Sequence, residues 1–228
     1  MNIKQRIYLY MAVAAIAMAG AQAAFADVTV VYKMTSPKGS ATQTIRYVDK
    51  QHVRLDMQND SVSRKMTLMK LGDTVYSITG KTVQDMNQLS GMLAAMGKGR
   101  VKHSNHAPIV YEDTGKTETI AGIQGKVYRF VERGKQHEVV LGQNSDLQAA
   151  ALGVVEINKA MAGTGMMPSD AGSQIQEDVS VKNMAMLRLD NAVHLQSINT
   201  DHIQDSEFVL PAKPQSFGGA GMGGMRGK

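Results

Sequence analysis

The residues best suited to chemistry are two histidines three positions apart. The sequence reads His103-Ser104-Asn105-His106, and imidazoles at this spacing on a loop can chelate Cu or Ni. Two ligands do not complete a metal site, and the other histidines are dispersed, with His52 and His194 expected to face solvent. The sequence therefore assigns no metal and no cofactor, and His103 and His106 are kept as an alternative metal site.

Methionine is the second residue type that could hold a metal, since the chain contains 17 of them. Thioether sulfur is a ligand for Cu(I), and Met166, Met167, Met222 and Met225 lie in glycine-rich stretches. These methionines are far from the histidines in the sequence, whereas copper sites usually place the two types close together. Periplasmic copper handling by histidine and methionine is therefore the second choice of function.

The known sequence signatures of catalysis are missing. The chain has no G-x-S-x-G elbow, no Walker loop, no H-E-x-x-H and no dinucleotide fingerprint after a strand. Cysteine is absent, which excludes thiol nucleophiles, zinc-thiolate sites and disulfides. The basic residues are scattered without interleaved aromatic residues, so nucleic-acid binding is not expected. We expect a protein that is not an enzyme, and we assign no catalytic residue.

The first 26 residues have the pattern of a secretory signal peptide. Lys4 and Arg6 precede an uncharged apolar stretch over residues 7–19, and Ala24-Phe25-Ala26 supplies the small-x-small cleavage pattern. The apolar stretch is shorter than the ~20 residues that span a bilayer, which favours cleavage after Ala26 over a membrane anchor. No cysteine is present to carry a lipid at the cleavage point. The predicted localisation is the periplasm, or secretion beyond it.

The elements that would position a site are mostly strands. Alternation of apolar and polar residues over 28–79 predicts an antiparallel meander of about five strands, and further strands follow residue 109. In the strand that begins at His52, the apolar residues Val53, Leu55 and Met57 should face the core. The alternating positions Arg54 and Asp56 should then face solvent.

Two helices are predicted among these strands. From Thr82 to Met96 the apolar residues are Met86, Leu89, Leu93 and Met96, whose offsets of three, four and three describe one helical face. A second helix is expected from Asp146, a plausible N-cap. The apolar face of the first helix must be covered, and the sheet is the surface available to cover it.

Part of the chain resembles a family of uncharacterised exported bacterial proteins with a domain of unknown function. Residues 118–128, Glu-Thr-Ile-Ala-Gly-Ile-Gln-Gly-Lys-Val-Tyr, are similar to that family's T-I-x-G-y-x-x-x-k-Y signature. Residues 138–142 resemble its E-v-W-v-t strand, although Val140 stands where the family often carries tryptophan. Residues 208–211 resemble its F-x-x-P terminus. The resemblance covers most of Val28 to Pro211 and implies the lipoprotein-carrier fold.

The predicted architecture is therefore α+β. A curved antiparallel open sheet, or half-barrel, of eight to ten strands is expected to wrap around two or three helices. Residues 1–26 are the signal peptide, residues 27–211 the folded domain, and residues 212–228 a disordered tail rich in glycine and methionine. The sequence does not indicate an oligomeric state.

The first choice of function is a non-catalytic periplasmic binding or carrier-like protein. Its apolar cavity between sheet and helices would accept a lipid, an acyl chain or a hydrophobic peptide. Loose contact with anionic headgroups at a membrane surface is compatible with the basic charge. The third choice is an envelope stress or structural factor that binds a protein partner. The residues expected to line the cavity are Met86, Leu89, Leu93, Met96, Val53, Leu55, Met57, Tyr128 and Phe130.

Overall fold

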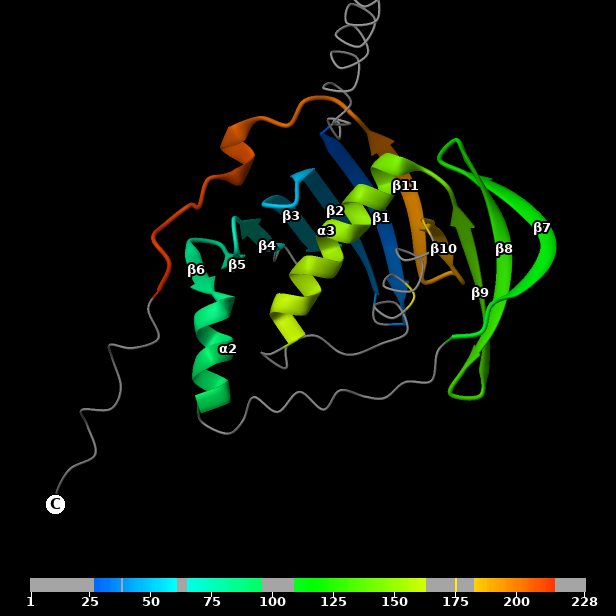
Figure 1. The fold of residues 1–228 in the computed structure, drawn as a ribbon, viewed down its shortest axis with the longest axis horizontal. Coiled ribbons are helices and arrows are strands. Elements are labelled where there is room, and N and C mark those ends of the chain that lie inside the picture. The colour runs from blue at the N-terminus through cyan, green and yellow to red at the C-terminus, as the bar shows by residue number, and fades with distance from the viewer. Residues whose placement is uncertain are drawn as a thin grey trace, which may run out of the picture.

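A computed structural model describes residues 27–37, 39–60, 65–95, 109–162, 175 and 183–215. Within these ranges the chain forms one sheet, two α-helices and a 3-10 turn (Figure 1). The helices are α2 (Met86–Ala95) and α3 (Ser145–Ala162), and the 3-10 turn is η1 (Asp205–Phe208). The strands are β1 (Val28–Ser36), β2 (Gly39–Asp49), β3 (His52–Asn59), β4 (Lys65–Leu71), β5 (Thr74–Thr79), β6 (Thr82–Asp85), β7 (Glu112–Ile120), β8 (Ile123–Glu132), β9 (Lys135–Gly142), β10 (Ala185–Leu189) and β11 (Val193–Asn199).

The sheet is open and antiparallel, with β6 and β7 at its two edges. The strand order is β6-β5-β4-β3-β2-β1-β11-β10-β9-β8-β7, so the N-terminal meander and the C-terminal strands join where β1 pairs with β11. This confirms an α+β fold with a curved open sheet (Figure 1). The described residues contain eleven strands rather than eight to ten, because residues 82–85 form an edge strand.

Both helices cover the same face of the sheet, which we call the helix-covered face. Helix α3 lies across β1, β2 and β3, and α2 packs against β5, β6 and α3. The alternation predicted for β1 is confirmed, since Val28, Val30 and Tyr32 are buried against the helices. The core on this face is mostly aliphatic, with Tyr32 and Tyr47 as its aromatic members.

Helix α3 lies very close to the sheet at Gly153. A Cβ atom added there would lie 2.8 Å from Cδ2 of Tyr47 and 2.9 Å from a methyl group of Val53. Both neighbours are buried, at 4% and 0% exposure, so neither can move aside without disturbing the core. Glycine therefore sets the distance between α3 and the sheet.

This close contact predicts opposite effects for one substitution in the two helices. Gly153→Ala should lower the free energy of unfolding by about 1–3 kcal/mol, because overpacking outweighs the gain in helix propensity. Gly91→Ala in α2 has nothing within 4 Å of the added Cβ. It should therefore stabilise the protein by up to about 1 kcal/mol. Urea unfolding of both variants measures the two signs, and stabilisation by Gly153→Ala would contradict the close packing of α3.

The opposite face, which we call the outer face, is also partly buried. One cluster there contains Phe130, Val139, Leu141, Leu189 and Ile175, with Tyr111 and Tyr128 packed against it. A second cluster contains Met69, Ile78 and Val83, and is contacted by Phe208 and Leu210 from the end of the chain. The sheet is therefore covered on both faces at these places, and strict alternation of apolar and polar residues ends there.

Two predicted helix boundaries are corrected. Residues Thr82–Asp85 form strand β6, because Val83 pairs with Ile78 across a tight turn, and the helix begins at Met86. The Asp85 carboxylate accepts hydrogen bonds from the backbone N–H groups of Asn87 and Gln88, which caps α2. Helix α3 begins at Ser145, and Asn144 rather than Asp146 caps it through the N–H of Leu147.

Candidate functional site

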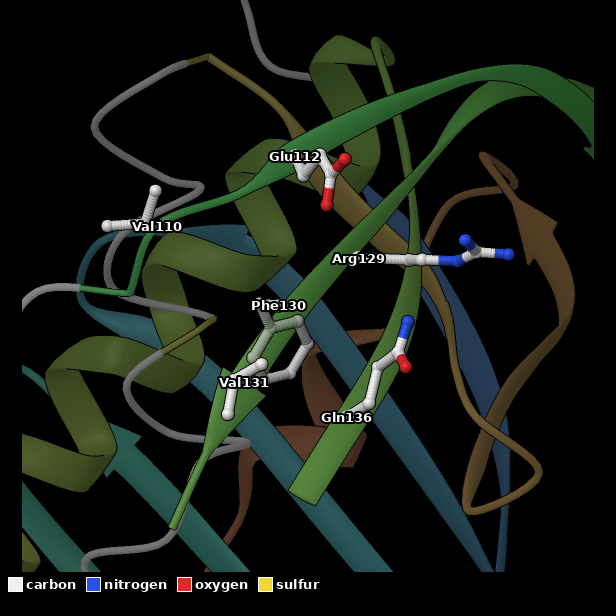
Figure 2. A pocket seen from close by; sticks show the side chains of 6 residues that line it. All are labelled: Val110, Glu112, Arg129, Phe130, Val131 and Gln136. Carbon is white, nitrogen blue, oxygen red and sulfur yellow. The ribbon is translucent and has the colours of Figure 1, made fainter. Parts of the chain in front are cut away.

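A hollow of about 300 Å³ lies at the ends of β7, β8 and β9 (Figure 2). Its lining mixes apolar and polar side chains: Val110, Glu112, Arg129, Phe130, Val131 and Gln136. Phe130 is buried at 3% exposure, whereas Val110 and Val131 are 82% and 68% exposed. Two large apolar side chains thus remain in water at the rim of the hollow.

Strand pairing places these residues together. Arg129 is the register partner of Glu112 on β7 and of Glu138 on β9, and Val131 is opposite Gln136. The β8–β9 turn is tight, with Arg133 at φ 49° and Gly134 at φ 75°. Glycine adopts this left-handed conformation without steric cost, so the turn holds the two strand ends in register.

The Phe130 ring packs against two other aromatic rings. It stacks on the His137 ring at 5.1 Å between centroids and meets Tyr111 at 5.8 Å. The His137 Nδ1 lies 2.7 Å from Oδ2 of Asp190, whose other oxygen accepts the backbone N–H of Glu138 at 2.8 Å. These contacts anchor one wall of the hollow to the turn between β10 and β11.

One arginine, Arg188, neutralises Glu118 and Glu138 on the strands that border the hollow. Arg188 Nη2 donates to Glu138 at 2.6 Å and to Glu118 at 2.9 Å, which ties together β7, β9 and β10. Burial alone would lower the pKa of Arg188, but these hydrogen bonds and charges outweigh it and raise the pKa. Among the described residues, no carboxylate lies within 4 Å of the Arg129 guanidinium, so its charge is available at the rim of the hollow.

Most residues predicted to line a cavity under α2 lie in the packed core. Val53 and Met86 are 0% exposed and Leu55 is 1% exposed. Leu89 belongs to the same cluster and Leu93 packs against it. Met57 is half-buried on β3. Met96 lies outside the residues that the structure describes.

Tyr128 and Phe130 do not meet this helix. Val127 and Val140 face the helices, and because successive residues of a strand point to opposite faces, Tyr128 and Phe130 lie on the outer face. The structure therefore separates the predicted lining into two groups on opposite sides of the sheet. Of the predicted residues, Phe130 lines the hollow at the ends of β7, β8 and β9.

Sequence reasoning missed the other five residues of the hollow. Phe130 and Val131 are consecutive apolar residues in a strand, and such a pair indicates that both faces carry apolar contacts. That signal was present in the sequence. The position of Val110 before β7, however, depends on pairing with β8 rather than on any local pattern.

A buried charged cluster occupies the outer face over β2, β3 and β4. Asp56 was expected to face solvent but is only 4% exposed. Its carboxylate accepts hydrogen bonds from Arg46 at 2.6 Å and from Thr67 at 2.5 Å. Arg54 Nε donates at 3.1 Å and Lys65 forms an ion pair at 3.3 Å.

The pKa of Asp56 follows from these contacts. Burial alone would raise the pKa of the carboxyl, but the Thr67 hydrogen bond and three neighbouring cations outweigh burial and lower it. These cations are Arg54, Lys65 and Arg46. Because Arg54 also binds Glu207, the cluster connects the sheet to the end of the chain.

The alternative metal site cannot be placed on the structure, because His103, His106, Met166, Met167, Met222 and Met225 lie outside the described residues. Within the described ranges, no three His, Asp or Glu residues converge in a way that could hold a metal ion. The predicted signal peptide and most of the predicted tail also lie outside those ranges. No helix in the described part of the chain has both the length and the apolar content to cross a bilayer.

Comparison with known proteins adds little to this site. No family model and no curated protein matches the chain. Two structures of PNGF-II, in space groups C2 and P21, are similar to it with TM-scores of 0.31 and identities of 11% and 10%. The match covers 83% of this chain, and the chain spans about a third (31%) of PNGF-II. A similarity this distant carries no argument about function.

Proposed function

We propose that this protein is a non-catalytic binding protein of the bacterial periplasm, exported by a signal peptide that is removed after Ala26. Its ligand is the apolar part of a lipid, an acyl chain or a hydrophobic peptide, held in the hollow beside Phe130. The proposal moves the binding site from the α2–sheet interface to the ends of β7, β8 and β9. It assigns no catalytic residue.

The observation that carries this proposal is the exposure of Val110 and Val131 at the rim of the hollow, at 82% and 68%. Removing apolar surface from water contributes about 25 cal/mol per Å², so a ligand covering both valines gains their burial as binding energy. Phe130 also lines the hollow beside these valines, although its ring is buried in the outer-face cluster.

The size and charge of the hollow limit the classes of ligand that it can hold. A volume of about 300 Å³ is at the lower end of the ~300–1,000 Å³ typical of small-molecule pockets. It suits one end of a chain rather than a whole lipid. The exposed guanidinium of Arg129 at the rim favours a carboxylate or phosphate on the ligand, since arginine binds both with paired hydrogen bonds.

Binding of a fatty acid that carries an environment-sensitive fluorophore tests the proposal. The wild type should bind the probe saturably, and Val131→Asp should weaken binding at least about tenfold, because the apolar contact is lost and a charge is added. Val209→Asp is the matched control, since Val209 is also 68% exposed but lies away from the hollow. Its affinity should match that of the wild type. No saturable binding by the wild type, or equal losses in both variants, would exclude this site.

A further inference from the structure

The end of the chain lies against the outer face of the sheet and reaches its β6 edge. After β11, residues 204–215, which we call the C-terminal segment, run to the β6 edge (Figure 1). The segment contains η1, and no strand of three or more residues is formed by it in the described structure. Its attachment therefore depends on a few side-chain contacts rather than on a long strand ladder.

The first contact is apolar. Phe208 and Leu210 pack against the outer-face cluster of Met69, Ile78 and Val83, while Val209 between them is 68% exposed. Leu71 and Tyr76 complete this apolar surface. The Phe208 ring also meets the His52 ring edge-on at 5.8 Å. Phe208 and Leu210 are thus held against the sheet on either side of an exposed Val209.

The second contact is polar. Arg54 Nη1 donates to the backbone carbonyl of Glu207 at 2.6 Å and to its carboxylate at 2.8 Å. Arg46 Nε lies 3.8 Å from the same carboxylate. Asp56 holds both arginines in place from the other side. This surface therefore selects an acidic residue followed directly by an aromatic one.

The third contact extends the sheet. Gln215 forms a parallel bridge with Gln84, and its N–H donates to the carbonyl of Val83 at 2.8 Å. β6 is an edge strand, and edge strands accept added peptide in this manner. The surface that binds the segment, which we call the docking surface, thus has three parts. They are the arginines that bind Glu207, the apolar patch and the edge strand β6, and the segment contacts them in that order.

We propose that this docking surface is an intermolecular peptide-binding site, and that its partner is the C-terminal segment of a second copy of this chain. The segment of each copy would then lie on the β3–β6 surface of the other. The required sequence, Glu207-Phe208-Val209-Leu210, is present in every copy, and the surface already binds it within one molecule.

The connection between segment and domain permits this exchange. Residues 200–204 form neither helix nor strand. The Asp27 carboxylate accepts the N–H of Ile203 at 2.7 Å and contacts His202, while Asn199 and Asp201 hydrogen-bond to each other and Ile203 is 7% exposed. A mutual exchange of C-terminal segments between two copies keeps every contact of the docked segment. The main free-energy cost of the exchange is therefore the association of two molecules. Higher protein concentration offsets that cost.

The absence of cysteine makes disulfide trapping a direct test. Gln84→Cys is made in one chain and Gln215→Cys in a second chain of different tag length. The two chains are unfolded together, refolded at high concentration and oxidised. Partners in a β-bridge have Cα atoms within disulfide range. The control mixes Gln215→Cys with Lys116→Cys, which is exposed on the opposite sheet edge.

We expect the disulfide-linked heterodimer between positions 84 and 215 to form at least about tenfold faster than the control heterodimer, because docking raises the effective concentration of the two thiols. Adding Phe208→Ala to the Gln215→Cys chain should remove this excess. Formation no faster than in the control would overturn the proposal. A single chain carrying both substitutions should close its disulfide internally at low concentration, and failure to do so would overturn the docking contact itself.

Discussion

Replacing Asp56 with alanine should lower the free energy of unfolding by about 3 kcal/mol. Asp56→Ala leaves Arg46 and Arg54 without their shared carboxylate, and breaking a buried ion pair costs ~3–5 kcal/mol. We expect the lower end of that range because the two arginine side chains remain 24% and 17% exposed. Chemical denaturation at neutral pH measures the difference.

The matched control is Asp60→Ala. Asp60 also pairs with a cation, Lys33, but both side chains are well exposed, at 40% and 38%. Exposed ion pairs contribute little to stability, so this variant should lose much less than Asp56→Ala. Equal losses in the two variants would show that the buried cluster does not hold the outer face together.

The same variant should reveal a pH dependence. The folded-state pKa of Asp56 is lowered, so its contribution is fully present above the unfolded-state pKa of about 3.9. That contribution disappears as the pH falls through the lower pKa of the folded state. The difference between wild type and Asp56→Ala should therefore be constant from about pH 5 to pH 7 and shrink below about pH 4. A difference that grows in acid would contradict the assignment.

Leu55→Ala should cost about 2–5 kcal/mol, the range for a leucine removed from a packed core. Leu55 is 1% exposed and lies in the cluster between β3 and the helices. The control is Leu152→Ala on α3, where the side chain is 42% exposed and the loss should stay below about 1 kcal/mol. A small loss for Leu55→Ala would instead indicate open space between the sheet and the helices.

This experiment also separates the two possible ligand sites. If the hollow beside Phe130 binds the fluorescent fatty acid, Leu55→Ala should retain the affinity of the wild type wherever the protein remains folded. Loss of binding by folded Leu55→Ala, with binding retained by Val131→Asp, would return the site to the helix–sheet interface.

Local pattern was enough to predict the fold class and several faces of the sheet. The alternation of Val28, Val30 and Tyr32 determined which side of β1 is buried, and the spacing of Met86 and Leu89 determined the buried side of α2. Apolar residues that repeat every two or every 3.6 positions indicate the buried face of a strand or a helix, because side chains on the covered face must be apolar. Element boundaries were less certain, since capping by Asp85 and Asn144 depends on backbone geometry.

The tertiary structure alone decided what covers the second face of the sheet. Asp56 alternates like a solvent-facing residue, yet the pairing of distant strands and the docked Glu207 bury it among cations. Phe130 was predicted to face the first helix, but the register of β8 with β9 places it on the outer face, away from α2. A strand's sequence shows that its two faces differ, whereas the identity of each covering segment follows from contacts between residues that lie far apart in the sequence, such as Arg54 and Glu207.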